Sequence, residues 1–183
     1  MSYQVHTIES ALPSAKDVLT RTQKAFGFVP NLLGVMADAP ALLKAYTTVA
    51  GFFDETSFTA TERQTILLSV SAENGCTYCV AAHSALASMQ KVPADVVSAI
   101  RDNTPIQDSK LEALRRFARA VVSTRGWPTA LETQAFLDAG YAKNQILEVV
   151  LGVGLKTLSN YANHIAETPL DQAFEKFARP KPT

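Results

Sequence analysis

The helix start and stop signals constrain the fold of this chain more than any other feature of its sequence. Thr59-Ala-Thr-Glu62 and Ser109-Lys-Leu-Glu112 both have the capping-box pattern, in which a hydroxyl and a carboxylate satisfy free N–H groups of a first helical turn. Four prolines stand where they suit the start of a helix: Pro30, Pro40, Pro93 and Pro128. No stretch alternates apolar and polar residues between hairpin turns, so the sequence predicts an all-α fold.

The expected helices cover most of the chain. The first runs over 15–26, capped by Ser14 and ended by Gly27, and two short helices start near Pro30 and Pro40. Further helices are expected over 60–72, 76–90, 93–103 and 111–123, then from Pro128 to Gly140. The segment 144–167 is apolar on most sides and predicts a central buried helix. Thr168-Pro169 is expected to cap a last helix over 170–178.

Length and charge narrow the class of protein. A chain of 183 residues, 47% of them hydrophobic, is long enough for one domain over 1–183 with a substantial core. Lys+Arg and Asp+Glu number 17 each, so no positive field attracts nucleic acid or an anionic membrane. The start lacks the pattern of a signal peptide, and the longest apolar run is interrupted by Glu148. We therefore expect a soluble, cytoplasmic protein without nucleic-acid or membrane partners.

The segment "ENGCTYCVAAHS" holds the only two cysteines, Cys76 and Cys79, followed four residues later by His83. A disulfide across so short a loop would remove little entropy from the unfolded chain, so chemistry is a better reason for the pair than stability. At 100° per residue the three side chains fall within about 60° on one helix face. The cysteine Cβ atoms would be about 5–6 Å apart, so a disulfide needs a tightened first turn, which Asn74-Gly75 permits.

Acid–base support for a thiolate is also present in this segment. Free N–H groups at the start of a helix stabilise a thiolate, and His83 can accept the thiol proton or stabilise the anion as imidazolium. A carboxylate could orient the imidazole, with Glu73 and Glu62 as the two candidates.

Two other interpretations compete with redox chemistry. The cysteines and the histidine could be inert core residues, or they could bind zinc with His164 as a fourth ligand. No second cluster of metal ligands is visible, and no glycine-rich phosphate loop stands before a helix. We therefore expect neither a metal nor a cofactor.

The stretch "TERQTILLSVSAENGCTYCVAAHSALA" resembles the alkylhydroperoxidase D-like branch of the carboxymuconolactone decarboxylase superfamily. The segments "FGFVPNLLGVMADAPALLKAY" and "AGYAKNQILEVVLGVGLKTLSNYANHIAETPLD" extend the resemblance over most of the chain. It implies an orthogonal all-α bundle that forms homo-oligomers, commonly trimers or hexamers. Members with Cys-x-x-Cys are thiol peroxidases that reduce hydroperoxides.

The resemblance also implies roles for individual residues. Cys79 corresponds to the peroxidatic thiol, Cys76 to the resolving thiol and His83 to the proton-relay histidine. The relay glutamate of the best-studied members falls at Gln64 in this chain. Two alternatives stay open: Glu73 or Glu62 takes its place, or the relay is weaker.

The expected function is a thiol-dependent peroxidase that cycles its cysteine pair between dithiol and disulfide. Its partners would be a hydroperoxide substrate, a thiol or dithiol reductant and further copies of the chain. The alternatives are a protein disulfide reductase or redox adaptor that uses the same thiols, and a non-catalytic oligomeric binding protein.

Overall fold

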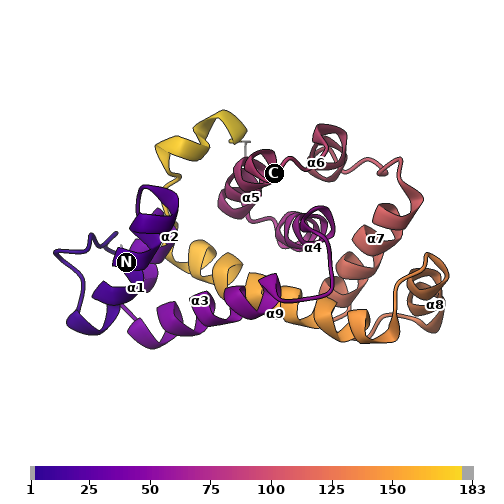
Figure 1. The fold of residues 1–183 in the computed structure, drawn as a ribbon, viewed down its shortest axis with the longest axis horizontal. Helices are drawn as coiled ribbons and strands as arrows, with labels where there is room; N and C mark the ends of the chain where they lie inside the picture. Colours follow the sequence, from indigo (N-terminus) through magenta and orange to yellow (C-terminus); the bar gives the residue numbers. More distant parts are fainter. Residues whose placement is uncertain (1–2, 179–183) are drawn as a thin grey trace.

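The computed structural model describes residues 3–178, and within that range it contains helices and no strand (Figure 1). The helices are α1 (Pro13–Phe26), α2 (Asn31–Met36), α3 (Pro40–Asp54), α4 (Ala60–Glu73), α5 (Thr77–Met89), α6 (Ala94–Arg101), α7 (Ser109–Ser123), α8 (Ala130–Asp138), α9 (Lys143–Ala166) and the 3₁₀ helix η1 (Gln172–Phe177). The all-α prediction is confirmed.

Helix α4 is the centre of the bundle. It packs against α5, α6, α7 and α9, and Figure 1 shows it nearly end-on, with α9 passing beneath it. Helix α3 lies along α9, and η1 returns from the far end of α9 to pack on α5. Helices that cross in this way form the expected orthogonal bundle, in which α5 is enclosed between α4, α9 and η1.

Three apolar clusters hold the helices together. One joins α1, α2 and α3 to the first turns of α5, and it contains Cys76 and Cys79. The second joins α3, α4, α7, α8 and α9, and the third joins α4 to α5 and α6. In the second cluster the Phe136 ring stacks between the rings of Phe117 and Tyr141, with centroids 4.5 Å from each. The cysteine pair therefore lies inside a core and not in a surface loop.

The capping box predicted for α4 is confirmed, whereas the cap of α7 lies one residue before the predicted Ser109. The Thr59 hydroxyl accepts a hydrogen bond from the Glu62 N–H at 3.2 Å, and the Glu62 carboxylate accepts one from the Thr59 N–H at 2.8 Å. Helix α7 is capped by Asp108, whose carboxylate accepts a hydrogen bond from the Leu111 N–H at 3.0 Å. Ser109 is therefore the first helical residue, because the carboxylate before it already fills the capping position.

Other helix starts also differ from the prediction by a few residues. Helix α1 begins at Pro13, so Ser14 is inside the first turn and is not the cap. Helix α8 begins after Thr129, whose hydroxyl forms a second capping box, and Pro128 precedes the cap. The last segment begins after Asp171 and is a 3₁₀ helix, where an α-helix was expected from about residue 170.

The central helix expected over 144–167 is α9, and it is buried on one face only. Gly152 and Leu155 on the inner face are buried, whereas Leu147 and Ile165 on the outer face are 71% and 69% exposed. None of the helices within residues 3–178 has the length and apolar character needed to span a membrane. The outer face of α9 carries apolar side chains that the other residues within 3–178 do not cover.

Gly152 marks the closest approach of α9 to its neighbours, and we predict that Gly152→Ala destabilises the fold. A Cβ there would lie 2.8 Å from both Ile66 Cγ2 and Phe53 Cε2, so the substitution overpacks the core. Overpacking of this kind lowers the free energy of unfolding by about 1–3 kcal/mol. Gly51→Ala in α3 is the matched control, because nothing lies within 4 Å of its added Cβ. The control should gain up to about 1 kcal/mol from helix propensity. Urea denaturation checks both; equal effects of the two substitutions would contradict the packing argument.

Candidate active site

A break between α4 and α5 places the two cysteines at the start of a helix. Gly75 has a φ of +67°, which turns the chain sharply after α4. Cys76 is the N-cap of α5 with φ −83° and ψ 91°, so it is extended, whereas Cys79 lies within the first helical turn. The expected interruption at Asn74-Gly75 is confirmed, and the non-helical Cys76 gives the first turn the freedom that a disulfide would need.

Both thiols are free and buried, each 1% exposed. The Asn163 side chain of α9 donates a hydrogen bond through Nδ2 to Cys79 Sγ at 3.2 Å, and the same nitrogen lies 3.9 Å from Cys76 Sγ. The Asn163 Oδ1 atom is buried and has no hydrogen-bond partner among the described residues. One amide from a distant part of the chain therefore points its donor at the cysteine pair.

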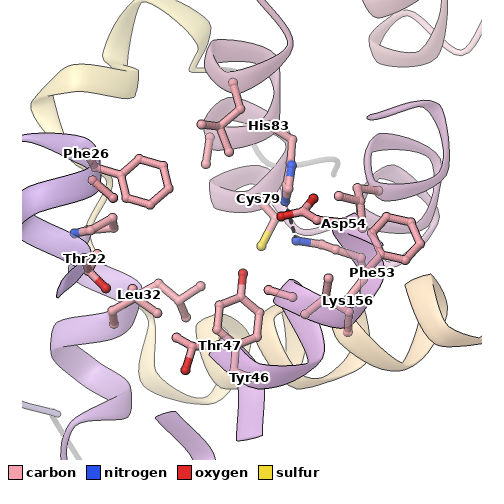
Figure 2. Close-up of a pocket in the computed structure, with 18 of the residues that line it drawn as sticks. Thr22, Phe26, Leu32, Tyr46, Thr47, Phe53, Asp54, Cys79, His83 and Lys156 are labelled. Carbon is pink, nitrogen blue, oxygen red and sulfur yellow. Dashed lines mark hydrogen bonds between the residues drawn. The ribbon is translucent and has the colours of Figure 1, made fainter. Parts of the chain in front are cut away.

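A lysine that sequence reasoning missed lies beside the pair. Lys156 of α9 is 1% exposed, and its Nζ donates a hydrogen bond to His83 Nε2 at 2.9 Å. Figure 2 shows its ammonium nitrogen beside the Cys79 sulfur and below the His83 ring, facing the same space as the Tyr46 hydroxyl. Within residues 3–178 no carboxylate lies at ion-pair distance from Lys156.

The other side of the His83 ring is held by a pair of glutamines. The His83 Nδ1–H donates to Gln64 Oε1 at 3.1 Å, and Gln64 Nε2 donates to Gln90 Oε1 at 3.1 Å. With Nδ1 carrying the proton, Nε2 offers its lone pair to Lys156. His83 is therefore oriented by an uncharged amide, at the position where the resemblance led us to look for a glutamate.

The environment shifts the pKa values of the two thiols in opposite directions. Burial alone raises the pKa of Cys79, but the hydrogen bond from Cys76 and the charge of Lys156 outweigh it and hold that pKa well below its usual value. The hydrogen bond to Cys79, together with burial, raises the pKa of Cys76. These shifts favour the thiolate on Cys79 and the protonated thiol on Cys76.

The same environment fixes the charges of the two bases. Burial, and then the charge of Lys156, holds the pKa of His83 well below its usual value, so its imidazole is neutral. Burial lowers the pKa of Lys156, but the interaction with Cys79 raises it, and the net shift is above its usual value. Of the two ways in which His83 was expected to act, stabilising the thiolate as imidazolium does not fit this arrangement.

A cavity of about 480 Å³ opens onto this cluster. Figure 2 shows Cys79, His83 and Lys156 on one side of it, facing Phe26 and Leu32 on the other. Cys79 lines the cavity and Cys76 does not. Its walls are mainly apolar side chains: Phe26, Leu32, Leu33, Tyr46, Ala50, Phe53, Leu67, Ala82, Leu86, Leu155 and Phe174. The cavity offers a molecule of moderate size direct access to one sulfur.

The carboxylates proposed for His83 lie elsewhere, and that prediction is corrected. Glu73 accepts a hydrogen bond from Arg119 Nε at 2.7 Å, at the end of α4 that points toward α7. Glu62 serves the cap at the other end of α4 and pairs with Lys110 at 3.5 Å. Both glutamates are drawn to cations and free N–H groups at the helix ends, while the position against His83 belongs to Gln64.

The zinc interpretation finds no support in the part of the chain that the structure describes. No three His, Cys, Asp or Glu side chains come together there in a way that could hold a metal ion. His164, the suggested fourth ligand, is exposed on α9 and stacks on Tyr161 with ring centroids 6.4 Å apart. Cys76, Cys79 and His83 are brought together as predicted, but His164 is not.

Helix α9 carries the residues that the sequence analysis overlooked. Lys156, Asn160 and Asn163 recur at spacings of three and four on its buried face. Buried polar side chains at helical spacing within an apolar helix are a signal of a polar site. We expected a central buried helix, apolar on most sides, and did not predict a polar site on it.

The chain is similar to known proteins both in sequence and in fold. Residues 38–120 match the model of the Carboxymuconolactone decarboxylase family. An alkylhydroperoxidase AhpD core structure, an uncharacterized peroxidase-related protein from Ralstonia eutropha JMP134, has a TM-score of 0.82 at 21% identity over 94% of this chain and 93% of that one. An uncharacterized peroxidase-related protein from Silicibacter sp. TM1040 has a TM-score of 0.79 at 18% identity over 94% and 93%.

A third similar structure has a different activity in its name. A cysteine-to-alanine variant of the debrominase Bmp8, in complex with 2,3,4-tribromopyrrole, has a TM-score of 0.76 at 18% identity over 90% of this chain and 89% of that one. No curated protein sequence matches the chain. The family match over residues 38–120 and the shared fold agree with the resemblance seen in the sequence.

A neutral His83 predicts an acid-sensitive fold. Below the usual pKa of 6.5 the histidine takes up a proton in the unfolded chain but not in the folded one. The free energy of unfolding therefore decreases as the pH is lowered through that range. His83→Gln removes this loss. Relative to the wild type, the variant should gain stability, by up to about 2 kcal/mol, between pH 7 and pH 5, measured by denaturant unfolding. His164→Gln, at an exposed histidine, is the control; parallel curves for wild type and His83→Gln would mean that folded His83 takes up the proton.

Proposed function

We propose that this chain, an AhpD-like member of the carboxymuconolactone decarboxylase superfamily, is a thiol-dependent peroxidase that reduces hydroperoxides through Cys79 and Cys76. The observation that carries the proposal is the difference between the two sulfurs. Cys79 lines the cavity and has a lowered pKa, whereas Cys76 does not line it and has a raised pKa. A peroxidatic thiol needs substrate access and a low pKa, and a resolving thiol needs only to be near.

The proposed cycle balances with a dithiol as the reductant. The Cys79 thiolate attacks the outer oxygen of the hydroperoxide, the O–O bond breaks, and Cys79 becomes a sulfenic acid while the alkoxide leaves and takes a proton. The Cys76 sulfur then attacks Cys79 and displaces hydroxide, which leaves as water. An external dithiol reduces the disulfide and returns the two protons. Each turnover converts one hydroperoxide to an alcohol and water and oxidises one dithiol.

The cavity favours an organic hydroperoxide over hydrogen peroxide. Its volume of about 480 Å³ lies in the range of cavities that bind small organic molecules, and its walls are mainly apolar. Hydrogen peroxide would leave most of that apolar surface in contact with water. Burial of an alkyl or aryl group against Phe26 and Leu86 would instead contribute binding free energy.

We also propose that the chain forms a homo-oligomer through the outer face of α9. Four exposed apolar side chains lie there, namely Leu147, Val150, Tyr161 and Ile165. At 100° per residue they fall within about 60° of one another and form one stripe. A continuous apolar stripe on a folded surface is typical of a protein interface, and further copies of the chain are the occupants that the family resemblance implies.

The assembly is tested by light scattering coupled to size exclusion. We predict a mass several times the 19.8 kDa of one chain for the wild type. Leu147→Asp with Ile165→Asp should reduce that mass, because a buried carboxylate without a partner is costly. Leu131→Asp is the matched control, since Leu131 is 81% exposed on α8, away from the stripe. A monomeric wild type at micromolar concentration would reject the proposal.

The peroxidase proposal predicts different fates for the two cysteines. With dithiothreitol as reductant, the wild type should consume cumene hydroperoxide with a higher kcat/KM than hydrogen peroxide. Cys79→Ser should abolish turnover and leave Cys76 unmodified by one equivalent of peroxide. Cys76→Ser should trap sulfenic acid on Cys79 and permit further oxidation to sulfinic acid. Mass spectrometry of the treated variants, with dimedone as the sulfenic acid probe, checks these outcomes.

The alternatives give other results in the same experiment. Oxidation confined to Cys76 would exchange the two roles. Disulfide reduction that exceeds peroxide turnover by orders of magnitude would favour a disulfide reductase or redox adaptor. Absence of both activities, with the oligomer intact, would favour a non-catalytic binding protein.

A further inference from the structure

Lys156 is a buried cation for which the rest of the structure supplies no fixed anion. It is 1% exposed, and no carboxylate within residues 3–178 lies at ion-pair distance from it. Its Nζ donates a hydrogen bond to His83, whose imidazole is kept neutral by burial and by the charge of Lys156. A buried ammonium group without an anion is strongly disfavoured, so the group either loses its proton or has an anion beside it.

The groups that face Cys79 leave Lys156 as the source of positive charge. The buried ones are Cys76, Tyr78 and His83 from α5, Tyr46 from α3 and Lys156 from α9. Two exposed charged residues also line the cavity, Arg21 of α1 and Asp54 of α3, and Asp54 pairs with Arg63 at 3.8 Å. Tyr78 donates its hydroxyl hydrogen to Asp171 at 2.6 Å, and burial raises the pKa of both tyrosines, so they are neutral phenols. His83 cannot easily become a cation, because an amide holds its Nδ1–H and Lys156 faces its Nε2.

We propose that the Lys156 ammonium is the charge that holds Cys79 as a thiolate, and that it donates the proton to the alkoxide released from the hydroperoxide. The second half of this inference rests on the proposed peroxidase function, whereas the first half concerns the thiol alone. After the donation the amine is neutral and the sulfur is a sulfenic acid. Reduction of the later disulfide by the dithiol returns one proton to Lys156 and one to Cys76.

The role of His83 follows from this assignment. Its Nε2 accepts a hydrogen bond from Lys156 at 2.9 Å and so fixes where the ammonium group lies. Gln64 fixes the tautomer in turn, by accepting from Nδ1–H. His83 is therefore a positioning residue, and the catalytic acid is the lysine.

The first test measures the thiolate without any peroxide. The rate of Cys79 alkylation by iodoacetamide, followed by mass spectrometry as a function of pH, reports the thiol pKa. Lys156→Met should move the midpoint of this profile upward by roughly 1–3 pH units, because the opposite charge is gone. His83→Gln should move it less. Lys143→Met, at an exposed lysine on the same helix, is the control and should not move it.

A compensating substitution separates lost charge from lost structure. In the Lys156→Met background, Gln64→Glu places a carboxylate on the His83 Nδ1–H, which raises the histidine pKa and lets the imidazolium replace the lysine charge. The alkylation midpoint should then return part of the way toward that of the wild type. An unchanged midpoint in Lys156→Met, or a larger shift in His83→Gln than in Lys156→Met, overturns the proposal.

The wild-type protein gives an independent test if Lys156→Met fails to fold. Disulfide formation removes the thiolate, so one lysine side chain should titrate at lower pH in the oxidised protein than in the reduced one. Carbon–proton NMR of the lysine Cε groups detects this change. Identical lysine titrations in the two redox states overturn the proposal.

Peroxide turnover tests the proton donation and keeps the two proposals distinct. At a pH high enough to ionise Cys79 in both proteins, Lys156→Met should still reduce kcat/KM for cumene hydroperoxide by about 10²-fold or more. Full turnover at that pH would overturn the donor role. An alkylation shift without peroxide turnover in the wild type would leave the charge assignment standing and reject the peroxidase function.

Discussion

The site depends on the burial of one ammonium group. Lys156 lies in the interior between α9 and α5, where Coulomb interactions are much stronger than in water and an unpaired charge is costly. Among the described residues, the titratable groups that respond to it most are His83 and Cys79, because burial keeps Tyr46 a neutral phenol. The His83 Nδ1–H donates to the uncharged Gln64, and its Nε2 faces the lysine, so the histidine stays neutral. The lysine charge therefore acts mainly on the pKa of the Cys79 thiol. The low pKa of Cys79 and the neutrality of His83 are two consequences of this single constraint.

Much of this arrangement could be predicted from local sequence signals. The box at Thr59 and Glu62 starts α4, Asn74-Gly75 ends it, and the cysteines follow in register because helix geometry is set within a few residues. Errors of one or two residues arose where two capping groups compete, as Asp108 and Ser109 do. Such competition is decided by the direction from which the chain enters the helix, and a sequence pattern does not contain that direction.

The partners of the site residues could not be predicted in the same way, because they come from across the fold. Gln64 lies 19 residues before His83, Lys156 lies 73 after it, and Asn163 lies 84 after Cys79. Sequence proximity favoured Glu73 as the partner of the histidine. In the fold, however, a helix end turns Glu73 toward Arg119. Proximity in sequence is a guide within one helix and loses its value at a break such as Gly75.

Helix α9 carries polar side chains on its buried face and apolar side chains on its exposed face, the reverse of an ordinary amphipathic helix. Its inner face supplies Lys156 and Asn163 to the cysteine pair, and its outer face exposes Leu147 and Ile165. A helix that presents polar groups inward gives up apolar contacts that would otherwise anchor it to its own chain. Contacts made by the outer stripe would restore that anchoring from outside. Assembly through α9 would therefore hold the lysine at the sulfur, so the same helix would serve both quaternary structure and thiolate chemistry.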